Sequence, residues 1–419
     1  AALVAAVQAG EVLLLRSGSL MAWAGYEEEE VEVETRRGME KVKKWVPRRE
    51  AQPLPCRQQI EAHHPEAILP ADELERLCGA LKRRDRRGQD IPFDAAPIVS
   101  VSHCTHLCGL KPSGLRAPLT TGDRCPVCVI GWEGPDAPDP QARTLRTVAQ
   151  ALAGEWDKGL GTPTSGLPCY AAWGFAEVGV FFDFASLYQN KPTMRTPPQE
   201  ALFKKALNAM SMWYCSTLTT VIVVRGQDAF LSTPREERGW PTYELLMANV
   251  FKQAPPSIGF RLDSGGVFAW SKVVEAGGAA EGGGGQQRQR PPMAPSRFAE
   301  RLQSLIFTNA ADRGVVSELY RKTLEDGFGG LTALRYPDLG WGDAEAAELL
   351  ATLREVRCPH VVELDLSKNN ELRSAEALAG IGELPALQTL DLSECEGLTA
   401  LPDALGQCTA LQELNLSYC

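Results

Sequence analysis

The hydrophobic pattern is most regular between residues 361 and 419. Three six-residue stretches carry apolar residues at their first, fourth and sixth positions, namely VVELDL from Val361, LQTLDL from Leu387 and LQELNL from Leu411. Their starting points are 26 and then 24 residues apart. Alternate side chains of a strand share one face, so each stretch predicts a short strand that points its leucines inward. The next copy then stacks on it and buries them.

This period and pattern resemble leucine-rich repeats. Asn369, Cys395 and Cys419 fall where that repeat places Asn or Cys to bond the turning backbone. A degenerate copy starts at Leu331, and a helix predicted over residues 343–356 follows it, as in the ribonuclease-inhibitor subtype. The last two copies resemble the shorter plant or bacterial type. The alternative is an ordinary helix and strand whose spacing is accidental. Three copies in register disfavour this alternative. The resemblance implies a concave strand face that binds a partner, expected to be another protein.

Apolar runs alternate with helical patterns between residues 96 and 255. Continuous apolar strands that alternate with helices predict an open parallel sheet covered on both faces. The predicted strands are 97–102, 178–183 and 219–224, and the predicted helices are 140–156, 199–214 and 240–251.

Four motifs in this segment resemble, in order, elements of fungal heterokaryon-incompatibility domains. They are VSHC at 101–104, DFASLYQ at 183–189, Met210 with Tyr214, and RGWPTYE at 238–244. The last motif is also similar to the W-C-x-x-E-L of TIR domains, with Trp240, Glu244 and Leu245 at the matching positions. The resemblance implies a TIR-like, flavodoxin-like α/β domain that self-associates.

TIR-like chemistry gives this segment a candidate catalytic site. Ligands of open parallel sheets lie beyond the carboxyl ends of the strands, where Asp183 ends one strand and Glu244 follows another. Many TIR domains cleave the nicotinamide–ribose bond of NAD, and nicotinamide leaves as a neutral pyridine. One carboxylate that holds the ribose and stabilises an oxocarbenium-like state therefore suffices. The resemblance assigns this role to Glu244, with Trp240 and Asp183 beside it and Ser102 and Tyr243 as NAD-binding residues. In the alternative, Glu244 is a first-turn residue favoured by the helix dipole, Trp240 is core, and the domain is a non-catalytic assembly domain.

Residues 105–131 separate Cys104 from Trp132, and they form a Cys-rich insertion relative to the heterokaryon-incompatibility motif. Soft and imidazole ligands in this number suit a closed tetrahedral zinc site in a non-catalytic scaffold. The segment is alternatively a family-specific insertion or an untrimmed stretch from gene prediction. A redox C-x-x-C pair is disfavoured because no thioredoxin-like context follows it. The candidate ligands are Cys104, His106, Cys108, Cys125 and Cys128.

Composition and charge narrow the class of protein. A chain of 419 residues, 44% apolar and 23% charged, predicts two or three globular domains. A net charge of −10 argues against a general nucleic-acid binder. No window of about 18 apolar residues and no basic secretory n-region is present, so we expect a cytoplasmic protein without a membrane span. Its 12 Cys are expected to be reduced thiols. The chain lacks an initial Met and ends inside a repeat, so we expect a fragment.

These patterns predict five consecutive regions. A charge-rich N-terminal region of unclear fold includes Glu27 to Glu30 and Lys41 to Lys44, which we interpret as a solvated surface of alternating sign, and a helix at 72–84. The Pro-rich loop at 190–198, with Arg195, is either solvated or a self-association loop. The five regions are the charge-rich N-terminal region at 1–95, the α/β domain at 96–255, a loop and Gly/Pro-rich linker at 256–296, a helical cap at 297–327, and the repeats at 328–419.

Overall fold

The computed structural model describes twelve stretches of the chain, and every structural statement below concerns them. They form two compact units, the first comprising Ala1–Ala248, Lys252–Gln287 and Phe307–Ala310, and the second comprising Asn249–Phe251, Arg288–Ile306 and Ala311–Cys419. The described residues are 2–35, 38–85, 98–102, 139, 141–153, 177–190, 193–216, 219–225, 237–250, 257–261, 290–307 and 310–419.

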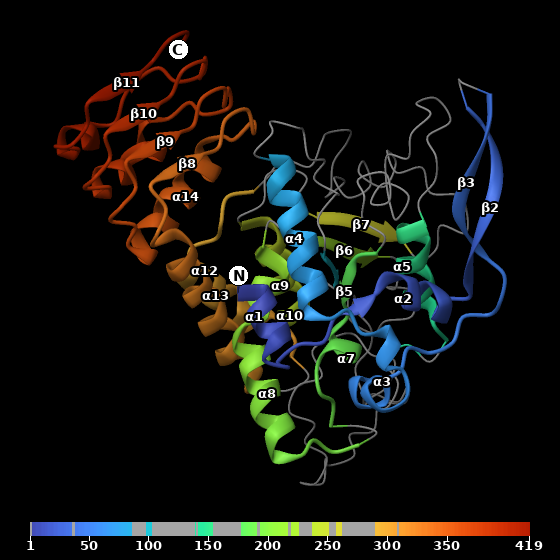
Figure 1. The fold of residues 1–419 in the computed structure, drawn as a ribbon. Coiled ribbons are helices and arrows are strands. Elements are labelled where there is room, and N and C mark those ends of the chain that lie inside the picture. Colours follow the sequence, from blue (N-terminus) through green and yellow to red (C-terminus); the bar gives the residue numbers. More distant parts are fainter. Residues whose placement is uncertain are drawn as a thin grey trace, which may run out of the picture. The chain divides into compact units, whose positions relative to one another are not determined.

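A five-stranded sheet organises the first unit, which is of the α/β class (Figure 1). Its strand order is β1-β5-β4-β6-β7, in which β1 is antiparallel to β5 and the other four strands are parallel. The chain leaves β4 on one side to form β5 and then crosses to the other side to form β6. Such a reversal of winding marks the position where open α/β sheets bind ligands. The strands are β1 Leu15–Arg16, β4 Ile98–Ser102, β5 Gly179–Phe181, β6 Thr219–Arg225 and β7 Ser257–Arg261.

Both faces of this sheet are covered. Val180 and Phe182 join the core that contains the apolar residues of α2 and α5, whereas Phe181 stacks on Trp213 of α9 at 5.2 Å between ring centroids. Successive side chains of a strand point to opposite faces, so α5 and α9 lie on opposite sides of β5. The helices of this unit are α1 Ala2–Gln8, α2 Ser17–Trp23, α3 Arg57–His63, α4 Ala71–Asp85, α5 Arg143–Ala153, α7 Asp183–Ser186, α8 Pro197–Asn208, α9 Met210–Cys215 and α10 Gly239–Val250, with the 3-10 helix η1 Pro65–Ala67.

The N-terminal region belongs to the same core as the sheet. Leu15 pairs with Val180, and Leu20 and Ile60 are buried in one cluster with Val180 and Leu145. The helix predicted at 72–84 is α4. The charged stretch that we interpreted as a solvated surface is an antiparallel ribbon of two ten-residue strands, β2 Tyr26–Thr35 and β3 Gly38–Pro47.

The helix predicted at 199–214 is two helices, α8 and α9. A capping box starts α8, in which Thr196 accepts from the Gln199 N–H and the Gln199 side chain accepts from the Thr196 N–H. The Ala209 N–H bonds back to Ala206 at 3.2 Å as well as to Lys205, a 3-10-type closure that tightens the last turn of α8 and separates it from α9.

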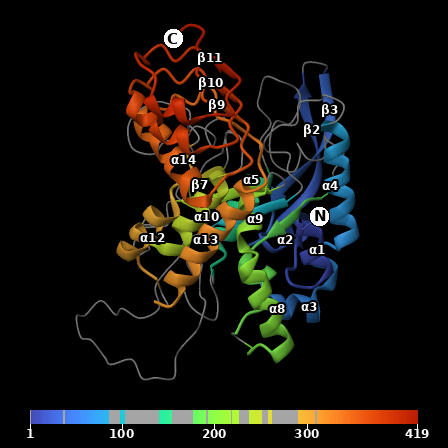
Figure 2. The same ribbon diagram turned by 90° about the vertical axis from the view of Figure 1, so that its left-hand side faces the viewer.

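The second unit is built from strands that follow one another in chain order. β8 Ala333–Arg335, β9 Glu363–Asp365, β10 Thr389–Asp391 and β11 Glu413–Asn415 form a parallel sheet (Figures 1 and 2). Leu334, Leu364, Leu390 and Leu414 lie in one register across it. Each strand is followed by a helical segment before the next strand begins. These segments are α14 Asp343–Val356, η4 Ala375–Glu383 and η5 Asp403–Gln407.

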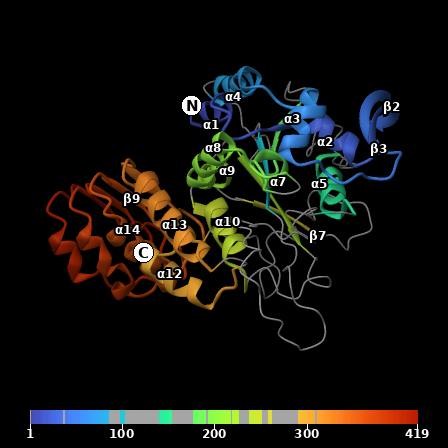
Figure 3. The same cartoon turned by 90° about the horizontal axis from the view of Figure 1, so that it is seen from below.

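Two helices, α12 Pro295–Ser304 and α13 Asp312–Phe328, pack with α14 (Figure 3). The Tyr320 hydroxyl donates to the Met293 carbonyl at 2.8 Å, and the Thr352 hydroxyl donates to the Pro292 carbonyl at 2.7 Å. The residues before α12 are thus fixed to both other helices, and they place this helical pair against the first strand-and-helix turn of the unit.

Candidate functional site

Asp183 lies at the carboxyl end of β5 and is the first residue of the short helix α7. The side-chain amide of Gln189 donates to the carbonyls of Asp183 at 3.3 Å and Leu187 at 2.9 Å. The spacing of Asp and Gln in the DFASLYQ motif therefore has a local structural cause. It places the Gln189 side chain where it can bond the backbone of the turn that begins at Asp183.

Glu244 lies on α10, which begins at Gly239. It is the sixth residue of that helix, so the interpretation of Glu244 as a first-turn residue is wrong, and the helix dipole does not account for it. Its side chain is 2% exposed, between buried Tyr243 and buried Met247. A carboxyl group in such a place is rare unless a partner or a function compensates its burial.

The fold brings Asp183 and Glu244 together, although they are 61 positions apart in the sequence. Burial, and then the charge of Glu244, raise the pKa of Asp183 well above its ordinary value, against a small opposite effect of the Phe184 N–H. Tyr214 lies beside both acids, and its pKa is raised first by burial and then by Glu244 and Asp183. Burial and the neighbouring Glu244 carboxylate therefore both favour the protonated form of Asp183.

The aromatic residues assigned to this site are also buried. The rings of Trp240 and Tyr243 meet edge to face with centroids 5.7 Å apart. Tyr243 precedes Glu244 in the sequence, and the charge of ionised Tyr243 contributes to the raised pKa of Tyr214. Ser102 is the last residue of β4, one strand away from β5. The described structure thus gathers Asp183, Glu244 and Tyr243, with Trp240 packed on Tyr243.

The sequence analysis did not identify Arg57 as a functional or structural residue. Its side chain is buried next to the core of the first unit. Its guanidinium donates to the carbonyls of Gly10 at 2.8 Å, Glu11 at 3.0 Å and Ser186 at 3.2 Å, and it lies 3.7 Å from the centroid of the Tyr188 ring. These contacts join the N-terminal segment and α3 to the turn that carries Asp183. Only the Arg57–Glu61 spacing along a helix was visible in the sequence, and it did not indicate burial.

Arg195, which we placed on a solvated or self-association loop, has a side chain that is only 5% exposed. It pairs with Glu200 at 2.8 Å, donates to the Tyr188 carbonyl at 3.0 Å and lies over the Phe203 ring. It therefore anchors the loop to α8 and offers no free cation.

A second candidate surface is the strand face of the second unit. The residues that flank each central leucine point away from the buried side, and they include Arg335, Glu363, Asp365, Asp391 and Glu413. Arg335 and Glu363 form a two-fold ion pair at 2.7 and 2.9 Å. One side of the sheet therefore presents a row of carboxylates with one paired arginine.

Polar side chains hold the turns that follow these strands. Asn369 makes five hydrogen bonds to the backbone of its own and the preceding turn. The Cys395 thiol donates to the Leu366 carbonyl at 3.3 Å, and the Cys419 thiol donates to the Leu392 carbonyl at 2.9 Å. These three residues bond the turning backbone, as the sequence predicted.

The predicted zinc ligands lie outside the described residues, namely Cys104, His106, Cys108, Cys125 and Cys128. Within the described residues, no three His, Cys, Asp or Glu side chains come together as a metal site. The zinc site stays a prediction from the sequence.

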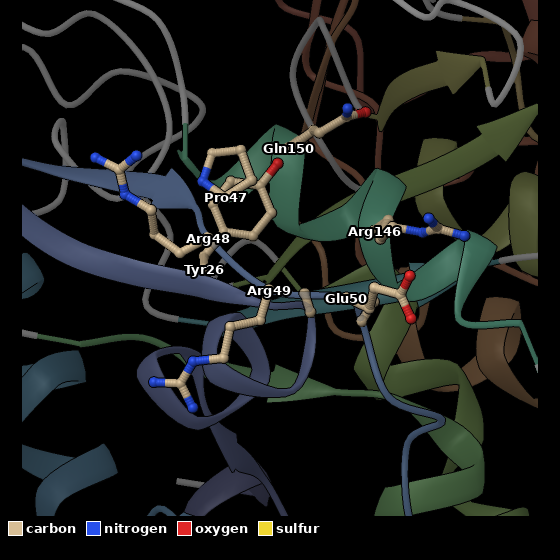
Figure 4. Close-up of a pocket in the computed structure, with 9 residues that line it drawn as sticks. Tyr26, Pro47, Arg48, Arg49, Glu50, Arg146 and Gln150 are labelled. Atoms are coloured by element: carbon tan, nitrogen blue, oxygen red, sulfur yellow. The ribbon is translucent and has the colours of Figure 1, made fainter.

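A hollow of about 430 Å³ lies between the base of the ribbon and α5 (Figure 4). Its lining includes Arg48, Arg49 and Arg146, and in Figure 4 the guanidinium groups of Arg48 and Arg49 point away from one another. These two arginines bind Glu29 and Glu27 of β2. The hollow therefore lacks a convergent set of cations.

None of the described helices combines the length and the apolar character that crossing a bilayer requires. No protein-family model and no curated protein matches this chain.

Proposed function

We propose that this chain is a protein-interaction and signalling protein. In this proposal the second unit is a leucine-rich-repeat solenoid that binds a protein partner. The first unit is a TIR-like domain, similar to heterokaryon-incompatibility domains, that self-associates. The observation that carries the proposal is the common register of β8, β9, β10 and β11, which follow one another in chain order and share one exposed face. Such faces are usual binding surfaces of repeat proteins.

The chemistry of this face favours a basic segment of the partner. Glu363, Asp365, Asp391 and Glu413 outnumber Arg335, which is already paired with Glu363. The carboxylates repeat along the sheet at the strand spacing of about 4.8 Å. A chain with several Lys or Arg residues laid across the strands meets one carboxylate after another.

The test compares two peptides of equal length, one rich in Lys and Arg and one rich in Asp and Glu, binding to the full chain by fluorescence anisotropy. We expect only the basic peptide to bind. Changing Glu363→Lys and Glu413→Lys together weakens its affinity about tenfold, since each exposed ion pair is worth up to roughly 1 kcal/mol. The matched control, Glu376→Lys with Glu383→Lys on η4, keeps the affinity. Equal losses in both variants exclude the strand face as the binding surface.

The buried acid pair supports a second candidate function, cleavage of NAD at the nicotinamide–ribose bond. Burial and the charge of Glu244 raise the pKa of Asp183 and favour its protonated form, and in this candidate Glu244 is the carboxylate that stabilises an oxocarbenium-like state. Trp240 and Tyr243 supply aromatic surface next to it. Both acids are buried, so the reaction also requires that neighbouring side chains move to admit NAD.

NAD loss, measured with the full chain at high concentration, tests this candidate. We expect turnover by the wild type and at least a 100-fold loss in Glu244→Gln, because that change removes the negative charge and keeps the shape. Glu237→Gln, an exposed acid just before α10, is the control that keeps turnover. If the wild type leaves NAD intact, or Glu244→Gln is as active as Glu237→Gln, this candidate is excluded and the binding function stands.

A further inference from the structure

The ribbon of β2 and β3 is a long, isolated pair of strands. Its register runs without interruption from Tyr26 opposite Pro47 to Thr35 opposite Gly38. Ten residues at about 3.4 Å per residue give strands of about 34 Å. Among the described helices of the first unit, α2 packs on β2 and α5 packs on β3, at the base of the ribbon (Figure 1).

Both long edges of the ribbon are open in the described part of the chain. β2 and β3 form a two-stranded sheet of their own, and no other described strand pairs with them. In an antiparallel pair, every other residue of each strand turns its N–H and C=O groups outward. A two-stranded ribbon is marginally stable alone, and an open edge of this length is a template for another strand.

The two edges carry opposite charge. β2 presents Glu28, Glu30 and Glu32, and β3 presents Lys41 and Lys43, all exposed. Lys43 binds Glu28 at 2.9 Å, and their side chains remain 74% and 43% exposed. The ribbon is therefore acidic along one edge and basic along the other.

We propose that a second copy of this chain pairs its β2 edge with the β3 edge of the first. Because β2 and β3 are antiparallel, two copies in the same orientation form an antiparallel pair at this contact. Pairing β2 with β2, or β3 with β3, places like charges opposite one another, which disfavours both symmetric dimers. The remaining contact is head to tail, so it extends from copy to copy instead of stopping at a dimer. This inference rests on the self-association half of the proposed function and names the contact that produces it.

A charge-swapped ribbon tests the contact in the full chain. Its five changes are Glu28→Lys, Glu30→Lys, Glu32→Lys, Lys41→Glu and Lys43→Glu. The swap keeps opposite charges across the ribbon, so the ribbon still forms. We expect the wild type and the swapped chain each to self-associate. In a mixture of the two forms, equivalent strands carry opposite charge, so carboxylate–amine cross-links between a wild-type and a swapped chain are expected to join β2 to β2 or β3 to β3, whereas those within either form join β2 to β3. Self-association also weakens as salt rises.

A control variant reverses two exposed charges on α4, Glu75→Lys with Arg76→Glu, and its cross-links with the wild type are expected to join β2 to β3. Cross-linking between isotopically distinct wild-type chains gives a readout that needs no swapped ribbon. It is expected to join the carboxylates of Glu28, Glu30 or Glu32 in one copy to the amine of Lys41 or Lys43 in another.

The outcomes separate the contact from the function. If the chain self-associates but the mixture of swapped and wild-type forms gives no β2–β2 or β3–β3 cross-links, the ribbon is not the contact, and self-association by another surface stands. If the wild type stays monomeric in sedimentation at all concentrations, both the ribbon contact and the self-association half of the proposed function are overturned. Intermolecular cross-links confined to surfaces away from the ribbon also overturn the contact.

Discussion

Substitution of Asn369 tests how the strands of the second unit are held together. Its side chain is 1% exposed and lies inside the turn after β9. The side-chain oxygen accepts from the N–H groups of Leu339 at 3.2 Å and Trp341 at 3.0 Å. The side-chain nitrogen donates to the carbonyls of Tyr336 at 2.9 Å, Leu366 at 2.7 Å and Ser367 at 3.3 Å.

The expected cost of Asn369→Ala follows from the groups that lose a partner. Leu366 and Ser367 keep other donors to their carbonyls, the Cys395 thiol and the Asp338 N–H. The Leu339 and Trp341 N–H groups and the Tyr336 carbonyl lose the Asn369 bond. Each buried group without a partner costs about 1–3 kcal/mol, and partial relaxation lowers the sum, so we expect a loss of about 3–5 kcal/mol.

Asn369→Cys is expected to cost about half as much. Cys395 and Cys419 occupy the equivalent place after β10 and β11, and each thiol donates to one carbonyl. A thiol at position 369 keeps such a donor but lacks the strong acceptor that the Leu339 and Trp341 N–H groups use. Asn370→Ala is the matched control, because Asn370 is exposed and next in the chain. Its expected effect is within about 0.5 kcal/mol.

Urea unfolding of the full chain measures the three variants. The two compact units can unfold separately, so amide exchange at Leu339 and Trp341 serves as the local readout. We expect both amides to lose protection in Asn369→Ala and to keep it in Asn370→Ala. A loss in Asn369→Ala that is no larger than in Asn370→Ala refutes the assignment of Asn369 as the group that holds these turns.

Three other predictions concern the first unit. Because burial and Glu244 raise the folded pKa of Asp183 above its ordinary 3.8, the folded state binds the extra proton, and wild-type stability falls as pH rises from that value through the folded pKa. Asp183→Asn is expected to remove this fall in urea unfolding between pH 4 and 8, whereas exposed Asp72→Asn keeps it. Arg57→Ala is expected to lower the free energy of unfolding by about 3 kcal/mol, since the Gly10 and Glu11 carbonyls lose the Arg57 donor while the Ser186 carbonyl keeps the Leu13 N–H, and exposed Arg76→Ala by less than about 0.5 kcal/mol. Cys125→Ser with Cys128→Ser is expected to remove about one bound zinc per chain, measured by elemental analysis of protein purified without chelators; zinc-free wild type would contradict the predicted site.

Elements with a strong local pattern were predictable from the sequence. The helix at 343–356 has the bounds of α14, and the strands at 97–102 and 219–224 correspond to β4 and β6. Each combines a regular apolar period with a clear start, such as Asp343 in the first turn of α14. Periodicity reports which face of an element is buried, so it identifies the element before any partner is known.

The ribbon and the buried Arg57 were not predictable in this way. The β2 and β3 segments carry Glu and Lys where a half-buried strand carries apolar residues, and their complementarity is visible only once the register sets Glu30 opposite Lys43. The burial of Arg57 was not predicted, because its acceptors are backbone carbonyls 46, 47 and 129 residues away in the chain. Pairings of this range depend on the tertiary fold, which local patterns do not encode.

A structural role and a catalytic role of Asp183 and Glu244 predict different effects of substitution. A buried acid pair opposes folding, because desolvation and mutual repulsion must be overcome, and replacement by neutral groups of the same shape is therefore neutral or stabilising. If the pair only fills the core, Glu244→Gln raises stability at pH 7 and changes nothing else. If the pair is a site, the same variant is more stable and loses NAD turnover, the trade between stability and activity that functional sites display. The stability change is the same in both cases and shows that the variant is folded, so NAD turnover of that variant assigns the role that neither the burial nor the raised pKa assigns alone.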